Sequence, residues 1–379
     1  MSFQLDPLYE ALREEARAVA AVVEPHAAEA DASSTLYPPV ADALAASQLS
    51  ELMVPAAYGG RFERLDPLAI AVVREVLMGT CSHLDSLFGL QGIGSYSLTV
   101  GGSEELRETW LPHVACGRAL AALALTEPET GSDLRQISTE LTSDGRLRGR
   151  KAFISNGGAA AFYSILTREG DGHSMVLVPA TAPGLTVLPT PEIIAPHVLG
   201  DLELDDVQVT PEWRLGEPGK GFALVLATLS IFRVSVAGAA IGLGQAALEE
   251  ATRHAATREQ FGQPLARLGA VAERLADSWA ELEAARLLTY RAGELARADP
   301  QASLHHSSMA KLLASETAGR IVDRGVQVMG RFGLIRDSKM ERLYRQARPM
   351  RIYEGASEVL RPGIARVLVD EVMRDATRA

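Results

Sequence analysis

The spacing of apolar residues divides the chain into three zones. From about residue 1 to 118 the apolar positions recur at helical spacing, and clusters of Pro and Gly interrupt them at 37–39, 58–60 and 101–102. Within this zone the segment 66–77 is rich in Ala, Val, Leu and Ile and predicts a buried helix. The first zone therefore predicts a helical domain.

Between about 119 and 215 the pattern changes to short apolar runs separated by turn residues. The turns Ser143-Asp144-Gly145 and Gly170-Asp171-Gly172 each separate two such runs, which is typical of β-hairpins. A further run at 201–209 alternates apolar and polar residues. Five or six strands in a zone of this length predict a small antiparallel barrel or sandwich.

From about 218 onward the helical spacing returns. One long amphipathic helix is expected where apolar residues lie three and four positions apart, at Leu268, Val271, Leu275, Trp279 and Leu282. Another is expected from about 303 to 329, and several long helices in succession predict an antiparallel four-helix bundle. We therefore expect a mostly α-helical protein with a central β domain, divided at 1–118, 119–215 and 216–379.

Composition excludes several classes of protein. Of the 379 residues, 47% are apolar, which is enough for a large core, and the net charge of −11 argues against nucleic-acid binding through phosphates. Acidic residues in the first turns argue against a signal peptide, and the longest apolar run, 222–232, is too short to cross a membrane. The two cysteines, Cys81 and Cys116, lie in different sequence surroundings and favour a reducing cytoplasm over a disulfide framework.

Two patterns that can signify a cofactor or a metal are set aside. The string GLGQAA at 242–247 matches a dinucleotide-binding fingerprint, but a charged helical segment follows it instead of a strand with an acidic tip. We interpret its small residues as a surface for close helix packing. The eight histidines show no spacing typical of a metal site, so no metal is predicted.

Four strings carry candidate chemistry: LALTEPETGSD at 123–133, KAFISNGG at 151–158, TREQFGQPL at 257–265 and RIYEGASEV at 351–359. Together, and in this order, they resemble the motifs of the acyl-CoA dehydrogenase family of flavoproteins. The resemblance covers essentially the whole chain. It implies the helical–β–helical fold of that family, FAD as the cofactor, and the conversion of an acyl-CoA to a trans-2-enoyl-CoA.

The first two strings hold the implied flavin contacts of the β domain. The first is a strand end that runs into a Pro/Gly turn, where backbone N–H groups and hydroxyls suit a heterocycle and a diphosphate. In the second, the resemblance implies that Phe153 packs beside the isoalloxazine and that the Ser155 hydroxyl reaches flavin N5. The implied cofactor contacts are Leu125, Thr126, Gly131, Ser132, Phe153, Ile154 and Ser155.

The third string implies a flavin site shared between subunits. In the family this loop reaches into the neighbouring subunit, so Arg258 would bind the diphosphate region and Phe261 would pack on the cofactor. Gln327, Gly330 and Arg331, in the string VQVMGRFG, match a further contact across the same boundary. The resemblance therefore implies a homo-oligomer, either a dimer or a tetramer.

The fourth string contains the implied catalytic base, Glu354. Removing the α-proton of a thioester requires a carboxylate held against an apolar substrate, with its pKa raised towards the working pH. The thioester oxygen would accept hydrogen bonds from the Glu354 N–H and a flavin ribityl hydroxyl, while the β-hydrogen passes as hydride to flavin N5. The resemblance also implies Ala356 and Glu358 as flavin contacts, and Ser132, Arg233, Tyr353 and Gly355 as substrate contacts.

The sequence also departs from the family pattern. Some members carry the base directly before the Arg that matches Arg233, but here that residue is Phe232, which cannot abstract a proton. Arg331 replaces a glycine and Gly269 replaces a glutamine. The segment 190–202 lacks the glycine- and serine-bearing loop that usually precedes the last β-strand. Further replacements are Gln346 in the R-D-A-R string and Ala356 where a Thr is usual. These departures concern the subunit boundary and the side where the thioester carrier and electron acceptor lie.

Three functional hypotheses follow. The leading one is FAD-dependent dehydrogenation of an acyl-CoA, with electrons passed to an electron-transfer flavoprotein. The altered segment 190–202 favours the first alternative, an oxidase or a dehydrogenase acting on a carrier-protein thioester. The second alternative is a non-catalytic helical interaction protein, which would not bind flavin. The segment 84–96 corresponds to the helix that lines the acyl pocket in the family. In this chain the segment contains no Arg or Lys, so dicarboxylic thioesters are not expected.

Overall fold

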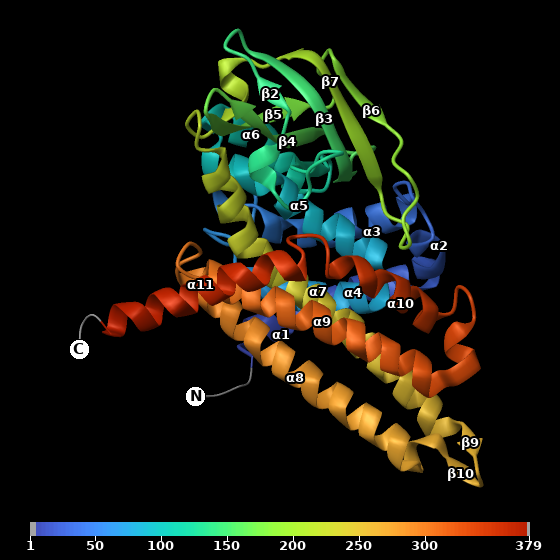
Figure 1. Cartoon of the computed structure of the whole chain (residues 1–379). Helices are drawn as coiled ribbons and strands as arrows, with labels where there is room; N and C mark the ends of the chain where they lie inside the picture. Colours follow the sequence, from blue (N-terminus) through green and yellow to red (C-terminus); the bar gives the residue numbers. More distant parts are fainter. Residues whose placement is uncertain (1–4, 377–379) are drawn as a thin grey trace.

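The computed structural model describes residues 5–376 as an N-terminal helical part, a β-sheet part and a C-terminal helical part (Figure 1). Residues 1–4, on which part of the argument against a signal peptide rests, lie outside the described residues. The expected fold class is confirmed. The domain limits at 118/119 and 215/216 stay predictions.

The N-terminal part is built from α1 (Pro7–Val23), α2 (Ala27–Asp31), α3 (Pro38–Ser47), α4 (Pro67–Thr80), α5 (Ser82–Gly101) and α6 (Glu104–Ala115). The helix expected at 66–77 is α4, and its start has a clear cause. The Asp66 side chain accepts hydrogen bonds from the backbone N–H groups of Leu68 and Ala69, and Pro67 takes the first helical position. Most of α4 is buried, as the sequence predicted.

The middle part is one eight-stranded sheet in which β1 lies beside β4 and the others follow the order β6-β7-β3-β2-β4-β5-β8. Its strands are β1 (Ala121–Ala124), β2 (Glu140–Leu141), β3 (Arg146–Ser155), β4 (Phe162–Glu169), β5 (Gly172–Pro179), β6 (Leu185–Leu188), β7 (Leu199–Gln208) and β8 (Arg214–Leu215). Both expected hairpins are confirmed, as the antiparallel pairs β2–β3 and β4–β5. Two pairings, β1–β4 and β2–β4, are parallel, and they join strands too far apart in sequence for a turn signal to reveal them.

The C-terminal part consists of α7 (Gly221–Thr257), α8 (Gly269–Ala298), α9 (Leu304–Met329), α10 (Lys339–Met350) and α11 (Ser357–Ala376). Helix α7 lies at its centre and packs closely against α4. A Cβ on Gly242 would lie 1.9 Å from the Glu75 carbonyl oxygen, and one on Gly238 would lie 2.3 Å from that of Ala71. The interpretation of GLGQAA as a helix-packing surface is therefore confirmed.

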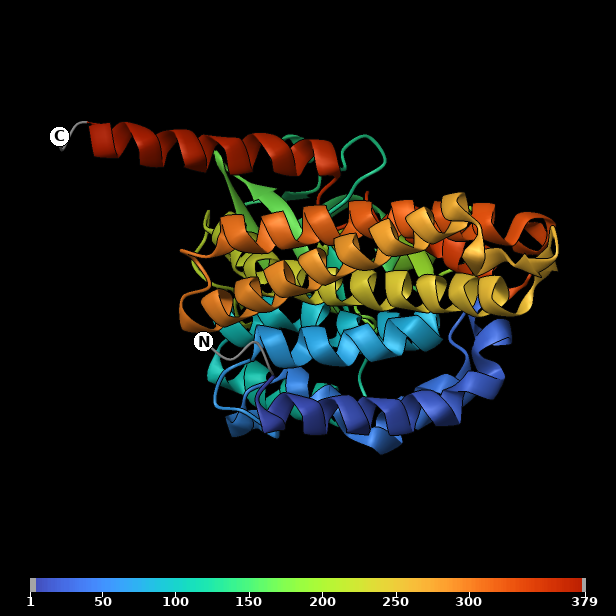
Figure 2. The same cartoon turned by 90° about the horizontal axis from the view of Figure 1, so that it is seen from below.

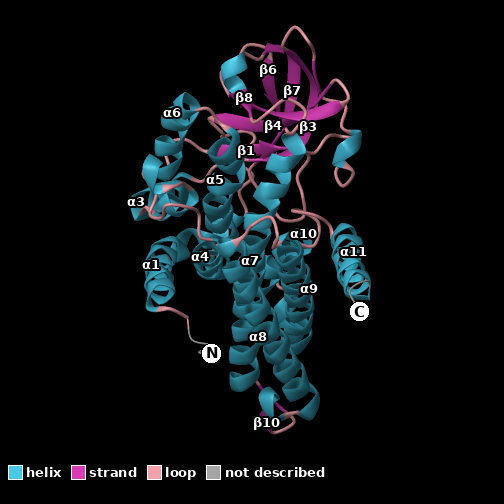
Figure 3. Ribbon diagram, turned by 90° about the vertical axis from the view of Figure 1, so that its left-hand side faces the viewer, coloured by secondary structure: helices cyan, strands magenta, loops and turns pink. Residues whose placement is uncertain are grey.

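The long helices run away from the sheet, and the small strands β9 (Glu259–Gln260) and β10 (Gln263–Pro264) form the tip of the bundle (Figure 3). Helix α11 separates from the rest of the bundle along much of its length, as the view from below shows (Figure 2). At the opposite end of the long helices from β9 and β10, the sheet meets α4, α5, α7 and α10.

Two sequence expectations need correction. The helix predicted over 268–282 is α8, but Trp279 is 64% exposed and the neighbouring Ser278 is buried. The other apolar positions do lie on the buried face, because Leu282 is buried and Val271 and Leu275 pack against the helical core. Only Trp279 departs from the predicted stripe. Helix α7 contains an 18-residue window with a mean hydropathy of 2.0, longer than the run at 222–232 suggested. Since 83% of that window is buried inside the protein, α7 is a core helix of this fold.

Candidate active site

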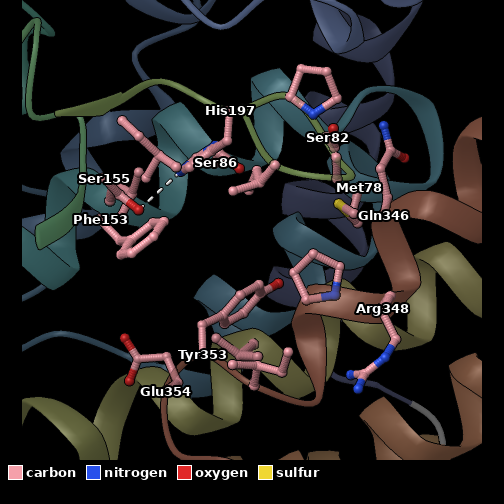
Figure 4. A pocket seen from close by; sticks show the side chains of 18 of the residues that line it. Met78, Ser82, Ser86, Phe153, Ser155, His197, Gln346, Arg348, Tyr353 and Glu354 are labelled. Atoms are coloured by element: carbon pink, nitrogen blue, oxygen red, sulfur yellow. Dashed lines mark hydrogen bonds between the residues drawn. The ribbon is translucent and has the colours of Figure 1, made fainter. Parts of the chain in front are cut away.

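A cavity of about 560 Å³ lies where the sheet meets the helices. Its wall comes from α4, α5 and α7, from the end of β3, from the loop before β7, and from α10 with the loop that follows it. Four residues singled out from the sequence meet here: Phe153, Ser155, Tyr353 and Glu354. Figure 4 shows Tyr353 and Glu354 on one side of the opening and Phe153 and Ser155 on another. Residues from two distant strings therefore share one cavity.

The end of β3 is distorted so that its aromatic residue faces this cavity. Its pairing with β7 shifts register between Lys151 and Ile154, and Phe153 within the shift has a φ of 56°, a left-handed conformation. The Phe153 N–H donates to Asp201 Oδ1 at 2.9 Å, and half of the residue's surface is exposed. An irregularity of this kind turns a side chain out of the regular alternation of the strand. Ile154, by contrast, is buried in the sheet core.

The TEPETGSD turn is attached to β3 by a buried ion pair. Lys151 Nζ lies 2.9 Å from Glu127 Oε1 and also donates to the Leu125 carbonyl at 3.1 Å, while the Ala152 N–H donates to the Thr126 carbonyl. Burial alone would raise the pKa of Glu127, but hydrogen bonds from Thr139 and Ser138 and the charge of Lys151 lower it to about 2. The turn is thus fixed next to Phe153, with Gly131 and Ser132 exposed on it.

Glu354 lies on a loop that two cations hold by its backbone. The loop follows α10, and both Glu354 (φ 56°) and Gly355 (φ 100°) adopt left-handed conformations. Arg233 Nε of α7 donates to the Glu354 carbonyl at 3.0 Å, and Lys311 Nζ of α9 donates to the Gly355 carbonyl at 2.7 Å. A left-handed glutamate is strained, so these two bonds explain how the loop keeps its shape.

The Oε2 atom of the Glu354 carboxylate is buried, and the carboxylate is incompletely hydrogen-bonded. Among the described residues its Oε2 atom has no hydrogen-bond partner. Burial raises the pKa of Glu354 above its ordinary value, and the nearby charges of Arg233, Lys311 and Arg74 oppose that shift only in part. A carboxyl group in such surroundings is suited to accept a proton from a molecule bound in the cavity.

The other wall of the cavity is mainly apolar. It includes Leu90 and Ile93 of α5, Met78 of α4 and Val236 of α7, together with the small residues Ser82 and Ser86. The α5 segment expected to line an acyl pocket therefore does line the cavity.

One charged residue on this wall was missed by the sequence analysis. Arg74 of α4 is a lone arginine in an apolar helix, and its guanidinium lies against Gly89, where a Cβ would come within 2.7 Å of it. Arg74 donates to both oxygens of Asp85, at 2.9 and 2.6 Å, and to Ser235 Oγ at 3.1 Å. The pair is buried and neutral overall, so Arg74 is not a free cation awaiting a second carboxylate.

A second missed residue is His197, in the loop between β6 and β7. Its Nε2 atom lies 2.9 Å from Ser155 Oγ, and its ring lines the cavity (Figure 4). In the sequence, the segment 190–202 was unusual only because it lacks the family's glycine- and serine-bearing loop. It gave no sign of which residue would face the cavity.

The remaining candidates lie elsewhere. Arg258, Phe261, Gln327, Gly330 and Arg331 gather at the tip of the bundle, around β9 and β10, on the side away from the sheet (Figure 3). There Phe261 is 89% exposed, and the guanidiniums of Arg258 and Arg331 lie over the Phe332 ring. These residues cannot contact a ligand in the cavity of their own chain.

The two predicted flavin contacts of the fourth string also lie outside the cavity wall. Ala356 precedes α11 and Glu358 lies in its first turn, with its side chain exposed. Within residues 5–376 no group of three or more His, Cys, Asp or Glu side chains is placed to hold a metal ion.

Comparison with known families matches almost the whole chain to three consecutive domains. The N-terminal domain of acyl-CoA dehydrogenase matches residues 7–118, its middle domain matches 122–207, and its C-terminal domain matches 219–369. Among individual proteins, the chain is 34% identical to cyclohexane-1-carbonyl-CoA dehydrogenase of Geobacter metallireducens, over 92% of this chain and 94% of the relative. It is 35% identical to cyclohex-1-ene-1-carbonyl-CoA dehydrogenase of the same organism, with the same coverage.

Solved structures agree with these matches. The structure of butyryl-CoA dehydrogenase from Megasphaera elsdenii has a TM-score of 0.92 and 28% identity, covering 97% of this chain and 100% of that one. Glutaryl-CoA dehydrogenase from Mycobacterium smegmatis in complex with FADH2 has a TM-score of 0.89 and 25% identity, covering 96% and 95%.

Proposed function

The chain belongs to the acyl-CoA dehydrogenase family, and from this membership we propose that Glu354 is the base of an FAD-dependent dehydrogenation of acyl-CoA. The protein is an oxidoreductase of that family and uses FAD. One observation supports the role of Glu354 above the others. Its carboxylate has a buried Oε2 atom that lacks a hydrogen-bond partner among the described residues, and it lines the same cavity as Phe153 and Ser155.

The residues around the cavity fit a flavin. Phe153 offers an aromatic ring on a bulged strand end, Ser155 offers a hydroxyl, and the turn 126–132 lies next to them with exposed backbone and hydroxyl groups. Phe153, Ser155 and this turn would hold the FAD. Bound FAD supplies the acceptor for the hydrogen and two electrons that leave the substrate's β-carbon.

The chain's own part in the reaction is to take the α-proton and hold the thioester. Glu354 receives the proton, and the two electrons of the broken α-carbon–hydrogen bond become the new double bond as the β-hydrogen leaves with its own electron pair. The Glu354 N–H polarises the thioester oxygen, and the bonds from Arg233 and Lys311 to the adjacent carbonyls fix the direction of that N–H.

The acyl group is proposed to be compact and without a second carboxylate. The wall formed by Met78, Leu90, Ile93 and Val236 is apolar, and Arg74 is already paired with Asp85. At this wall a free carboxylate would lose its hydration without gaining an unpaired cation, because the cavity's other arginine, Arg348, belongs to α10 and not to this wall. The relatives named for cyclohexane and cyclohexene carboxylic thioesters suggest short or alicyclic acyl groups as the first to test.

We propose that the cluster at the tip of the bundle acts in a second subunit. Arg258 and Phe261 are exposed and distant from their own cavity, which is consistent with a flavin site completed by a neighbouring copy in a homo-oligomer. The electron acceptor is proposed to be an electron-transfer flavoprotein, and the location to be the cytoplasm. These two statements rest on the family and on the unpaired cysteines.

The function is tested by anaerobic titration of the FAD-loaded protein, following the visible flavin band. Butyryl-CoA, cyclohexane-1-carbonyl-CoA, octanoyl-CoA and glutaryl-CoA form the panel. We expect bleaching by one of the monocarboxylic substrates and none by glutaryl-CoA. We expect Glu354→Gln to bind FAD and to bleach at least about a hundredfold more slowly. If the protein binds FAD but only a carrier-protein thioester bleaches the flavin band, the result would favour the alternative of a dehydrogenase that acts on a carrier-protein thioester. Protein that takes up no FAD would overturn the proposal.

A further inference from the structure

The loop before β7 holds His197 at a fixed distance from the Ser155 hydroxyl. Ser155 is the register partner of Leu199, and the next residue, Asn156, donates its N–H to the Val198 carbonyl at 2.8 Å. His197 therefore adjoins a hydrogen-bonded part of the ladder, and its 2.9 Å contact with Ser155 follows from the register. Arg345 Nη1 of α10 also reaches the Ile194 carbonyl, at 3.5 Å, on the same loop.

The histidine ring is neutral at ordinary pH. Burial, together with the nearby His83, lowers the pKa of His197 to about 4. A neutral imidazole has one nitrogen that donates and one that accepts. The single hydrogen of the Ser155 hydroxyl can therefore be accepted by the ring, which leaves only oxygen lone pairs to face the cavity, or it can point into the cavity itself.

We propose that His197 is a positioning residue that accepts the Ser155 hydroxyl hydrogen, so that Ser155 meets the bound flavin as a hydrogen-bond acceptor. This inference rests on the proposed function and on the family resemblance, which implies that the Ser155 hydroxyl reaches flavin N5. Oxidised flavin N5 is an acceptor, whereas N5 of the reduced flavin carries a hydrogen. An accepting Ser155 therefore favours reduced FAD, and His197 raises the reduction potential of the cofactor.

The inference gives a substitution test with a physical readout. In His197→Ala the Ser155 hydrogen is free to donate to oxidised FAD, so the potential should fall. We expect about a tenfold shift of the equilibrium towards oxidised FAD, which is about 30 mV for a two-electron couple. The measurement is equilibration of the FAD-loaded protein with a reference dye, without substrate. An unchanged or higher potential would overturn the inference.

A double-substitution cycle shows whether His197 acts through Ser155. In Ser155→Ala the hydroxyl is gone, so adding His197→Ala should move the potential by less than about twofold more. An additive shift in the double variant would mean that His197 acts on the flavin by another route, and would overturn the inference. The exposed His113 on α6 provides the matched control, and His113→Ala should leave the potential unchanged.

A conservative variant covers the case in which His197→Ala does not retain FAD. The amide oxygen of His197→Gln can still accept from Ser155, so we expect its redox equilibrium within about threefold of the wild type. A markedly lower potential in this FAD-bound variant would count against the inference. The proposed function fails separately, when the wild-type protein binds no FAD or when no acyl-CoA bleaches it.

Discussion

Two glutamates, Glu127 in the β part and Glu354 in the helical part, show how the same side chain can have opposite properties in one protein. Glu127 is buried, and Glu354 is partly exposed with a buried Oε2 atom. Glu127 accepts hydrogen bonds from Ser138 and Thr139 and pairs with Lys151, and its pKa is lowered to about 2. Glu354 has an Oε2 atom without a partner among the described residues, and its pKa is raised. Burial acts on both carboxyls in the same direction. What separates them is the number of donors, and this difference supports the proposal that the incompletely paired glutamate is the reactive one.

The largest effect should come from removing the reactive carboxylate. We expect Glu354→Gln to lower the rate of flavin reduction by roughly 10²–10⁴-fold, the usual contribution of a positioned base. FAD binding should persist because the backbone bonds from Arg233 and Lys311 do not involve the side chain. Stopped-flow absorbance measures the rate, and a loss below tenfold would contradict the assignment.

Removing the charge of the paired carboxylate, Glu127, should lower the stability of the fold. Glu127→Gln leaves Lys151 buried without its counter-charge, which costs about 3–5 kcal/mol of the free energy of unfolding. Urea denaturation measures the change. The control is Glu140→Gln, which breaks the exposed ion pair of Glu140 with Arg168 on the same sheet and should cost less than about 1 kcal/mol.

An intermediate effect should appear in the pH dependence of the reaction. The base is active when ionised, so the rate rises with pH through the pKa of Glu354. In Lys311→Met a nearby positive charge is lost, ionisation becomes less favourable, and the rising limb should move to higher pH. Single-turnover rates across pH measure the shift, with the exposed Lys220→Met as control. An unmoved limb would show that Lys311 does not influence the base.

The smallest effect should be a gain in stability from removing Glu354. Its raised pKa means that the folded state binds a proton more tightly than the unfolded state, so stability falls as pH rises from the ordinary carboxyl pKa through the raised one. Glu354→Gln should therefore be more stable than the wild type at pH 8, by on the order of 1 kcal/mol or roughly 2 °C. The difference should vanish near pH 4, and thermal unfolding without substrate at both pH values checks it.

The sequence predicted most of the fold because its signals are local. Helical spacing located α4, α8 and α9, and turn residues at 143–145 and 170–172 located two hairpins. It could not predict the parallel partners of β4, which depend on contacts between distant segments. Trp279 shows a related limit, because apolar spacing identifies a helix without saying which neighbours cover it.

The candidate site was predictable as far as its motifs extend. Phe153, Ser155, Tyr353 and Glu354 belong to recognisable strings, and the structure brings them to one cavity. Arg74 and His197 belong to none, and their positions depend on the packing of α4 against α5 and on the register of β3 with β7. The assigned roles of all these residues stay predictions until the variants are measured.

The two cations that hold the Glu354 loop have a consequence for how this fold can evolve. Arg233 and Lys311 donate to main-chain oxygens, so these two bonds do not depend on which side chain stands at 354. A lineage could exchange the glutamate for another residue and keep the cavity, the loop and the bundle unchanged. A single substitution at position 354 could therefore abolish or change the reaction. In the product of a duplicated gene, such a substitution would carry little risk of misfolding.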